Sequence, residues 1–588
     1  MRVLYKLVSN TSLKTILWAN IVSGTLRLEC IRMSGQKMIG QKMKTKDKFV
    51  SVILFAMLCG QSLAADKPNI LVILVDDMGF SDLGCYGSEI PTPNLDALAA
   101  NGVRFTQFYN TARCSTTRAS LMTGLYPHQA GMGYLDGLKL PESNGTHAKL
   151  HERCVTMAEV LGNAGYHTSM VGKWHLGQQN GSAPWGRGFQ RTATTQFGEL
   201  YFPKEESKDA CKWVYLDGRK VAADSPEVGS GDWYSTFMFT DWSLKFLDDA
   251  KTSGKPFFQY FAHGAPHFPL RAPQEFIDKY RGKYKDGWDK LRDARHRKQI
   301  ALGIVDAKWP LSPRPVEVPV WESLRIEEQD RFDHLMAIYA AMIDCIDQSV
   351  GRMIAGLKER GMYENTLIVF MSDNGGNAEG GPNGISRGES LGGPDSTVFL
   401  GMPWATLNNT PFRRYKHFTH EGGISSPLIA HWPLGIPASR NGQLEKQPAH
   451  LIDIMATAVE VSGALYPAEH NGNRILPMEG ISLKPAFDGH PLHRVKPIFW
   501  MHEGNRAVRS GPWKAVKKFK GDWELYNIDA DRTEQSNLSA KNPQIAQLLI
   551  RQWDDWAATT YVDEWIGEAR NNWGEEVRAI NRSNANGR

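Results

Sequence analysis

The fold of this chain depends on one short stretch, Ile70-Leu71-Val72-Ile73-Leu74-Val75-Asp76-Asp77. Six consecutive apolar residues are typical of a strand that is buried on both faces, as in sheets covered by helices. The stretch ends in two neighbouring carboxylates, Asp76 and Asp77. Because α/β sheets bind ligands beyond the carboxyl ends of their strands, these side chains predict a binding site. Their hard oxygen atoms suit Ca²⁺ or Mg²⁺.

Four later apolar runs repeat this pattern. They are residues 166–171, 257–262, 366–371 and 427–431. Helices are expected over residues 232–249, 332–360 and 449–461, which separate most of the strands. Strands that alternate with helices in this way predict an α/β fold.

Cys114 opens the segment Cys114-Ser115-Thr116-Thr117-Arg118-Ala119-Ser120-Leu121-Met122-Thr123-Gly124. A lone cysteine in an apolar segment is usually a small buried hydrophobe. Here good helix formers follow, and Thr116 or Thr117 is expected to cap the helix start. Cys114 would then lie at or just before a helix N-terminus, where backbone N–H groups favour an anion. Arg118 lies one helical turn further on.

Polar side chains follow three of the other apolar runs where each run ends. They are Lys173 and His175, then His267, and then Asp373 with Asn374. Lys173 and His175 are two residues apart, so in an extended segment they face the same way. Lys416 lies in the basic segment 409–423, which leads into the last run.

These side chains together predict a single pocket. The carboxylates would hold a divalent cation, and Cys114 would be the precursor of a nucleophile. The cations Arg118, Lys173 and Lys416 would bind an anion with three or more oxygen atoms. Such a pocket suits the transfer of a sulfuryl or phosphoryl group by electrostatic stabilisation.

The pattern changes after about residue 484. Short strands are expected at residues 498–502, 506–509, 513–518 and 523–527, followed by a helix near 543–558. We therefore divide the chain into a catalytic domain, residues 66–484, and a C-terminal subdomain, residues 485–588, with an antiparallel sheet and a terminal helix. An insertion at residues 281–331 is expected to be partly helical and near the site; a solvated excursion is slightly favoured over a substrate lid.

Residues 1–65 are interpreted as a leader with a signal peptide at about 43–64. Three lysines precede the apolar run 49–58, and Ser62-Leu63-Ala64 fits a cleavage site. If translation starts at Met43, residues 1–42 are not part of the protein. The apolar run is too short to span a bilayer, so the expected location is periplasmic or secreted, without a membrane span.

The overall composition is that of a globular protein. Of 588 residues, 22% are charged and 41% hydrophobic, and the formal net charge of +5 gives no reason to expect a nucleic-acid partner. Seven cysteines are too sparse for a disulfide scaffold, and no Cys-x-x-Cys zinc pattern is present. Five follow the leader; one or two disulfides among the four other than Cys114 are possible.

The chain resembles the type I sulfatases of the arylsulfatase kind over about residues 67–560. The resemblance rests on six motifs in matching order: Leu74-Val75-Asp76-Asp77, Cys114-Ser115-Thr116-Thr117-Arg118, Gly172-Lys173-Trp174-His175, Ala265-Pro266-His267, Ser372-Asp373-Asn374-Gly375 and Lys416 before Glu421-Gly422-Gly423. It implies an alkaline-phosphatase-like α/β/α sandwich with a smaller C-terminal domain. It also implies the hydrolysis of aryl or carbohydrate sulfate esters.

The resemblance further assigns roles to the residues of the pocket. One Ca²⁺ would be bound by Asp76, Asp77, Cys114, Asp373 and Asn374. A formylglycine-generating maturation enzyme would convert Cys114 to formylglycine, whose hydrate is the nucleophile. The catalytic residues would be Cys114, Arg118, Lys173, His175, His267 and Lys416. His267 and Lys416 would act on the leaving alcohol, and His175 would remove a proton during sulfate release. The substrate would be a sulfated small molecule or saccharide.

Two alternatives stay open at this point. A phosphate or phosphonate monoester hydrolase of the same superfamily would use nearly the same residues. A catalytically silent protein that only binds sulfated glycans is the second, if Cys114 is not matured. Thr116 is the feature that supports this second alternative, because the family has Pro or Ala at that position.

Overall fold

The computed structural model describes residues 67–136, 143–177, 181–195, 199–204 and 211–565, together with the backbone of four strands before residue 41. The chain divides into two units, residues 1–66 and 67–588. In the first unit, four strands pair in chain order: β1 Arg2–Lys6, β2 Lys14–Val22, β3 Thr25–Ser34 and β4 Lys37–Gly40. The expected signal peptide, residues 43–64, lies outside the described residues.

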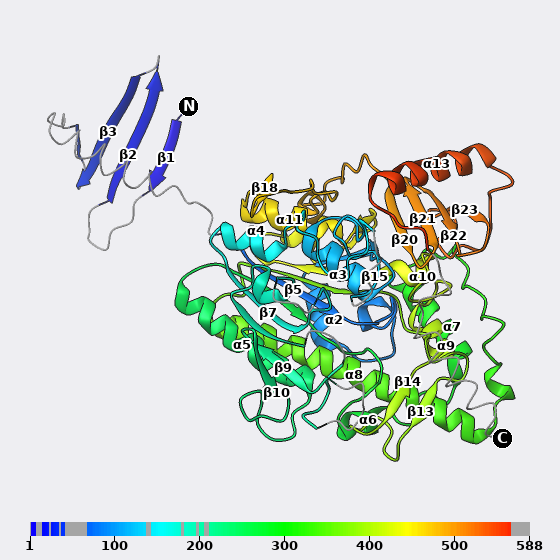
Figure 1. The fold of residues 1–588 in the computed structure, drawn as a ribbon. Coiled ribbons are helices and arrows are strands. Elements are labelled where there is room, and N and C mark those ends of the chain that lie inside the picture. Colours follow the sequence, from blue (N-terminus) through cyan, green and yellow to red (C-terminus); the bar gives the residue numbers. More distant parts are fainter. Residues whose placement is uncertain are drawn as a thin grey trace. The chain divides into compact units, whose positions relative to one another are not determined.

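A mixed sheet of 11 strands forms the centre of the second unit (Figure 1). Its strands are ordered β10-β9-β8-β7-β11-β5-β12-β15-β6-β16, with β17 also paired to β6. Their bounds are β5 Asn69–Val75, β6 Val103–Tyr109, β7 His167–Lys173, β8 Arg191–Thr195, β9 Trp213–Leu216, β10 Arg219–Ala222, β11 Phe257–Ala262, β12 Thr366–Ser372, β15 Ser425–His431, β16 Leu444–Glu445 and β17 Ala449–His450. All five apolar runs of the sequence are strands of this sheet.

Strand β5 lies in the middle of the sheet, parallel to β11 and β12. Its residues alternate between two hydrophobic cores: Leu71, Ile73 and Val75 face one, and Ile70, Val72 and Leu74 face the other. Burial on both faces explains why the run has no polar break. Strand β15 runs antiparallel to β12, so the sheet is mixed.

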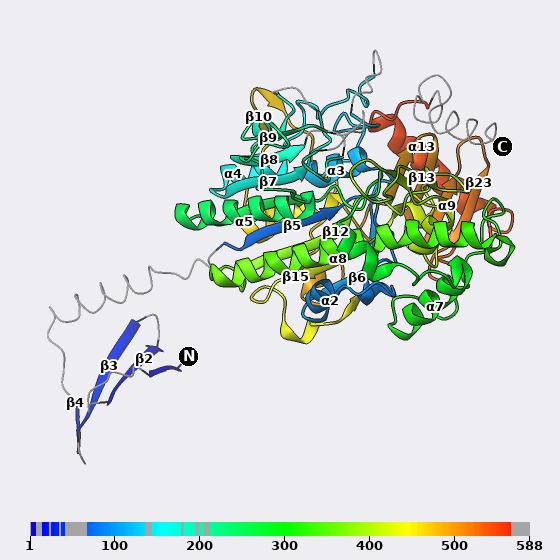
Figure 2. The ribbon, with the colours of Figure 1, turned by 90° about the horizontal axis from the view of Figure 1, so that it is seen from below.

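Helices cover both faces of the sheet, which gives the α/β/α layers that the resemblance implied. In Figure 1, α3, α4 and α11 lie on one side, and α5 and α8 lie on the other, where Figure 2 shows them running alongside β5. The helices of the first side are α3 Cys114–Thr123, α4 Met157–Asn163, α11 Ile452–Ser462 and α12 Lys484–Phe487. Those of the second side include α2 Pro93–Ala100, α5 Ser235–Ser253, α6 Gln274–Tyr280 and α8 Ile326–Glu359.

Local signals in the sequence set several of these bounds. Thr156 and Glu159 form a capping box at the start of α4, with Glu159 N donating to Thr156 Oγ1 over 3.1 Å. Pro93 occupies the first position of α2. Asp217 and Gly218 join β9 to β10 with positive φ angles of 48° and 84°, as a two-residue hairpin turn requires.

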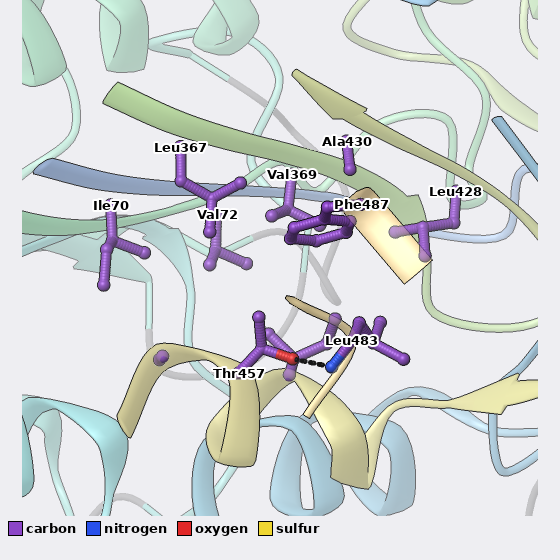
Figure 3. Close-up of a pocket in the computed structure, with 11 residues that line it drawn as sticks. Ile70, Val72, Leu367, Val369, Leu428, Ala430, Thr457, Leu483 and Phe487 are labelled. Atoms are coloured by element: carbon purple, nitrogen blue, oxygen red, sulfur yellow. Dashed lines mark hydrogen bonds between the residues drawn. The ribbon is translucent and has the colours of Figure 1, made fainter. Parts of the chain in front are cut away.

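Between the sheet and α11 lies a small apolar cavity of about 10 Å³ (Figure 3). Its lining comes from β5, β12, β15 and the segment around α12. The one polar group drawn there is satisfied: Thr457 Oγ1 accepts a hydrogen bond from Leu483 N over 2.8 Å. The cavity lies under the centre of the sheet, in the core that holds the sheet against α11.

The C-terminal strands form a separate antiparallel sheet, as expected. They are β20 Ile498–His502, β21 Asn505–Ser510, β22 Trp513–Lys517 and β23 Trp523–Asn527, followed by α13 Pro543–Thr559. One face of this sheet packs on α13 through Trp553 and Trp556, and the other packs on Tyr109 and Ile424 of the larger part. A buried ionic group reinforces the second contact: Lys514 Nζ lies 2.8 Å from carboxylate oxygens of both Glu421 and Glu534.

The segment 281–331 packs into the fold and is not a solvated excursion. It contains α7 Gly287–Ala301, whose Trp288 stacks edge-on against Trp321 and against Trp404 of α9 Met402–Asn408. Arg295 of α7 is buried and reaches Asp82 over 2.7 Å. The segment therefore supports α9, which leads into the loop 409–420 and α10 Glu421–Ile424.

Smaller elements complete the described part of the chain. They are the short strand pairs β13 Ile385–Arg387 with β14 Thr397–Phe399 and β18 Glu469–His470 with β19 Asn473–Arg474. Among the described residues, no helix is long and apolar enough to cross a membrane. The five described cysteines are all free thiols, so none of the disulfides that the sequence left open forms among them.

Candidate active site

All ten predicted site residues come together at the carboxyl ends of the central strands. Asp76 and Asp77 follow β5, Asp373 and Asn374 follow β12, and His267 follows β11. Lys173 is the last residue of β7 and His175 lies two residues beyond it. Cys114 is the first residue of α3, Arg118 lies one turn into that helix, and Lys416 comes from the loop before α10.

Asp76 is held between two buried cations. Its Oδ2 atom lies 2.6 Å from Lys173 Nζ and 3.0 Å from a guanidinium nitrogen of Arg118. The same guanidinium nitrogen lies 2.9 Å from Asp373 Oδ2. Although burial alone would raise it, Lys173 holds the pKa of Asp76 below its usual range. Burial and the neighbouring Asp76 carboxylate raise the pKa of Asp373.

Asp77 is held by one cation and two amides. Lys416 Nζ lies 2.8 Å from its Oδ1 atom, Asn374 Nδ2 donates to Oδ1 over 2.7 Å, and Asn377 Nδ2 donates to Oδ2 over 2.7 Å. Its backbone has a positive φ of 66°, a conformation that costs energy in a residue other than glycine. That conformation turns the chain sharply after Asp76, so that two adjacent carboxylates both face the pocket.

The donor set fits a hard divalent cation. Three buried carboxylates converge with the side chain of Asn374, and oxygen atoms of this kind are the usual ligands of Ca²⁺. Two oxygen atoms of the set, Asp76 Oδ1 and Asn374 Oδ1, are buried and have no hydrogen-bond partner. Buried acceptors are normally satisfied, so these two indicate a ligand. Asp76, Asp77 and His267 can also direct ligand atoms to one point.

Cys114 is paired with His175 at the start of α3. Burial would raise the pKa of Cys114, but His175 and then Lys173 lower it to about 5. Burial would lower the pKa of His175, but Cys114 and Asp136 raise it to about 9. Asp136 Oδ1 lies 3.1 Å from His175 Nε2 and orients the ring. The side chain at position 114 therefore lies beside an imidazole with a defined orientation.

His267 lies beside the opposite wall of the pocket. Its Nε2 atom lies 3.3 Å from Lys416 Nζ and 3.6 Å from Asp77 Oδ2. Its Nδ1 atom lies 3.3 Å from Glu199 Oε1, and Glu199 also lies 2.6 Å from Lys173 Nζ. Glu199 thus links Lys173 and His267, which flank the pocket.

The structure corrects two local expectations. The helix begins at Cys114 itself, with Arg113 at the cap, so Thr116 and Thr117 lie in the first turn and cap nothing. Thr117 Oγ1 instead donates to the backbone oxygen of Asp373 over 2.6 Å and ties the helix to β12. The segment after Lys173 is not extended, because His175 has a φ of 60°. His175 still lies beside Cys114, and the charge of Lys173 still acts on its thiol.

Sequence reasoning missed Asp136, Glu199 and Asn377, which contact the predicted residues, and Glu379, whose charge acts on Lys416. Each lies in an irregular segment with no strand or helix pattern, and nothing in its spacing connects it to the site. The many charged residues of the basic segment 409–423 indicated in part that this segment belongs to the site. The segment is not an exposed charged loop, because Lys416, Thr419 and His420 are buried.

The comparisons with known proteins agree with this geometry. The model of the family described as Sulfatase matches residues 68–464. An uncharacterized sulfatase of Schizosaccharomyces pombe is 33% identical over 85% of this chain and 96% of its own length. The chain belongs to the sulfatase family. It is therefore a sulfuric ester hydrolase.

This sulfatase is also similar to an arylsulfatase and to a crystal structure with a bound oligosaccharide. The arylsulfatase of Klebsiella aerogenes is 33% identical over 74% of this chain and 96% of its own length. The crystal structure of Ps i-CgsB in complex with k-i-k-neocarrahexaose has a TM-score of 0.64 and 26% identity, and covers 88% of this chain and 99% of that one. The sulfatase fold thus extends over both the large part and the C-terminal sheet.

Proposed function

We propose that this sulfatase uses a formylglycine formed from Cys114 and one Ca²⁺ ion to hydrolyse sulfate esters of saccharides outside the cytoplasm. The observation that carries the proposal is the position of Cys114. It lies at a helix N-terminus, beside three buried carboxylates, three buried cations and the two unpartnered oxygen atoms Asp76 Oδ1 and Asn374 Oδ1. Such a site combines a place for a nucleophile with charges that bind an anion.

Asp76, Asp77, Asp373, Asn374 and the side chain at position 114 would hold the Ca²⁺ ion. Together, the ion and the formylglycine supply an oxygen nucleophile and positive charge next to the sulfate group. With the ion present, the three carboxylates no longer depend on Arg118, Lys173 and Lys416 alone for neutralisation. These cations can then donate hydrogen bonds to sulfate oxygen atoms.

The remaining side chains are placed to move protons. His267 and Lys416 lie 3.3 Å apart on one wall, where either can donate a proton to the leaving alcohol. His175 contacts the side chain at position 114 on the other wall, and Asp136 fixes its ring. This suits His175 as the group that takes a proton from position 114 when sulfate is released.

Three observations support the finer parts of the proposal. The neocarrahexaose complex of Ps i-CgsB supports a saccharide substrate. The basic and apolar pattern of residues 43–64 supports export to the periplasm or the medium. The Cys114 segment supports a formylglycine-generating maturation enzyme as a partner.

The test is mass spectrometry of the tryptic peptide 114–118 from protein made in its native host, combined with turnover of 4-nitrophenyl sulfate. We expect an aldehyde in place of the thiol, and release of sulfate in proportion to the modified fraction. A wholly unmodified Cys114 would overturn the formylglycine part. It would favour the sulfated-glycan-binding alternative, for which Thr116 is the supporting feature. Faster turnover of phosphate or phosphonate monoesters than of sulfate esters would favour the other alternative.

A further inference from the structure

The pocket is closed on most sides, and this fixes where the leaving group must lie. The side chains of Asp76, Arg118, Asp373 and Lys416 are 0–1% exposed. The side chains of His175 and His267, by contrast, are 14% and 12% exposed. A sulfate bound to the buried cations would therefore point its ester oxygen and leaving group toward these two histidines.

A cluster of four charged side chains adjoins the site, and Asn377 links the two by donating to Asp77 Oδ2 over 2.7 Å and to Glu379 Oε2 over 3.1 Å. Arg113 directly precedes Cys114 and His417 directly follows Lys416. Glu379 and Glu503 join them: His417 Nε2 lies 2.6 Å from Glu379 Oε1, and His417 Nδ1 lies 2.8 Å from Glu503 Oε2. A guanidinium nitrogen of Arg113 lies 3.3 Å from Glu379 and 3.6 Å from Glu503. We call Arg113, Glu379, His417 and Glu503 the mouth cluster.

The backbone holds the mouth cluster in place. His417 has a positive φ of 81°, and its N–H donates to the backbone oxygen of Ala112 over 2.9 Å. Its carbonyl accepts from Asn505 Nδ2 over 3.1 Å. A strained residue that is bonded from two directions is typical of a functional position. Glu503 has a positive φ as well, at the turn between β20 and β21.

The carboxylates of the mouth cluster are paired with nitrogen-bearing side chains. Burial works against both carboxylates, yet Lys416 and Arg113 hold the pKa of Glu379 low, and His417 holds that of Glu503 low. Burial and Arg113 act against protonation of His417, but Glu503 raises its pKa. The cluster thus pairs two carboxylates with Arg113 and His417. It also offers both donors and acceptors at a partly exposed edge, since His417 is 23% and Glu379 is 17% exposed.

We propose that the mouth cluster is the leaving-group subsite of this sulfatase, and that it selects a neutral, hydroxyl-bearing leaving group over one that carries a second anion. The inference rests on the proposed function of the neighbouring pocket. A hydroxyl group can exchange hydrogen bonds with a carboxylate or with Arg113 without disturbing the charge balance. A second sulfate or a carboxylate faces Glu379 and Glu503, and can bind Arg113 only by displacing them.

The experiment compares two aryl sulfates that differ in one charge, 3-(hydroxymethyl)phenyl sulfate and 3-carboxyphenyl sulfate. The readout is the ratio of their kcat/KM values for matured protein. We expect the wild type to prefer the neutral ester by about tenfold or more, since like charges near a subsite oppose binding. Glu379→Gln and Glu503→Gln each remove one anion, and each should lower this ratio by about fivefold or more. Arg113→Gln should raise it.

Glu364→Gln is the matched control, because Glu364 is exposed and precedes β12 at the end away from the site. Its ratio should equal that of the wild type. Equal turnover of the two esters by the wild type would overturn the inference, as would a ratio unchanged in both glutamine variants. Failure of the proposed function would look different: matured protein would not release sulfate from 4-nitrophenyl sulfate at all.

Discussion

Nζ of Lys173 lies 2.6 Å from Oδ2 of Asp76, with both side chains buried. Asp76 is an expected ligand of the cation and Lys173 an expected ligand of the sulfate, so the contact joins the two halves of the site. The salt bridge keeps the ammonium group extended into the pocket. Without the salt bridge, water would solvate this group, and a sulfate oxygen would have to displace that water. Lys173 is therefore positioned before the substrate arrives.

Replacing Lys173 by Met should remove this charge while keeping much of the side-chain volume. We expect kcat/KM for 4-nitrophenyl sulfate to fall about 10²- to 10³-fold, as for the loss of other preorganised charges at a transition state. Lys255→Met, at an exposed position before β11, is the control and should keep wild-type kinetics. Wild-type activity in Lys173→Met protein would show that Lys173 does not contact the reacting group.

The cation site predicts a change in stability that does not depend on activity. Ca²⁺ binds only the folded protein, so Ca²⁺ at 100 times its Kd should stabilise the chain by about 2.7 kcal/mol. Melting curves with Ca²⁺ and with EDTA should show this as a higher Tm with Ca²⁺.

Asp373→Asn should abolish the response to Ca²⁺, because Asp373 is one of the three converging carboxylates. Asp554→Asn, on the exposed face of α13, should keep it. A wild-type Tm that is the same in Ca²⁺ and EDTA would contradict the assignment of the site.

The unmodified protein should contain one ionised thiol well below neutral pH. His175 and Lys173 lower the pKa of Cys114 to about 5 against the effect of burial, whereas burial raises the pKa of Cys85, Cys154 and Cys345. A lowered thiol pKa means that the thiolate forms as the pH rises through about 5 and persists above it.

Thiolate absorbance near 240 nm in protein made without maturation should therefore rise with a midpoint near pH 5. A Cys114→Ser variant supplies the baseline for all other cysteines. His175→Ala should move the midpoint upward, toward the ordinary thiol value of about 8.5. A midpoint that stays near 8.5 in the wild type would show that His175 does not stabilise the thiolate.

The ionic group beneath the C-terminal sheet predicts a large loss of stability. Lys514, Glu421 and Glu534 are completely buried, and Arg532 also contacts Glu421 over 2.9 Å. Lys514→Met should leave two buried carboxylates without their shared partner and cost about 3–5 kcal/mol. Urea denaturation measures this loss. Lys518→Met, at an exposed position just after β22, should change the free energy of unfolding little.

At the small cavity beside α11, a more apolar side chain is expected to lower the stability of the protein. Thr457→Val is nearly isosteric and more apolar, yet it removes the acceptor for the buried N–H of Leu483. An unsatisfied buried donor costs about 1–3 kcal/mol, so the variant should be less stable by that amount. Thr252→Val on α5, where the hydroxyl is exposed, is the control. A more stable Thr457→Val protein would show that filling the cavity outweighs the hydrogen bond.

The sequence predicted the strands of the site and the residues at their ends for one physical reason. Strands buried on both faces consist mainly of apolar residues, so a charged residue at the end of an apolar run marks a sheet edge. This rule predicts the positions of Asp76, Asp373 and Lys173. The C-terminal sheet was predicted for a similar reason, since its strands alternate between two separate cores.

The remaining contacts could not be predicted, because tertiary structure alone brings them together. Glu199 lies in a segment without a periodic pattern, yet it contacts Lys173 and His267. Glu503 lies at a hairpin turn 86 positions after His417 in the chain, where a charged residue would ordinarily face solvent. Two residues of the segment 281–331 do indicate that it is packed. Trp288 and Trp321 are large apolar residues that a solvated segment would not retain.

The turn that carries Glu503 has an evolutionary consequence. It belongs to the C-terminal sheet but contacts Arg113 and His417 beside the catalytic residues, so two regions far apart in the gene shape one recognition surface. Hairpin turns tolerate substitution and changes of length better than strands do. A sulfatase of this design can therefore acquire new substrates through mutations in one C-terminal turn while its catalytic residues stay the same. Exchanging the β20–β21 turn between relatives would be a direct way to engineer that change.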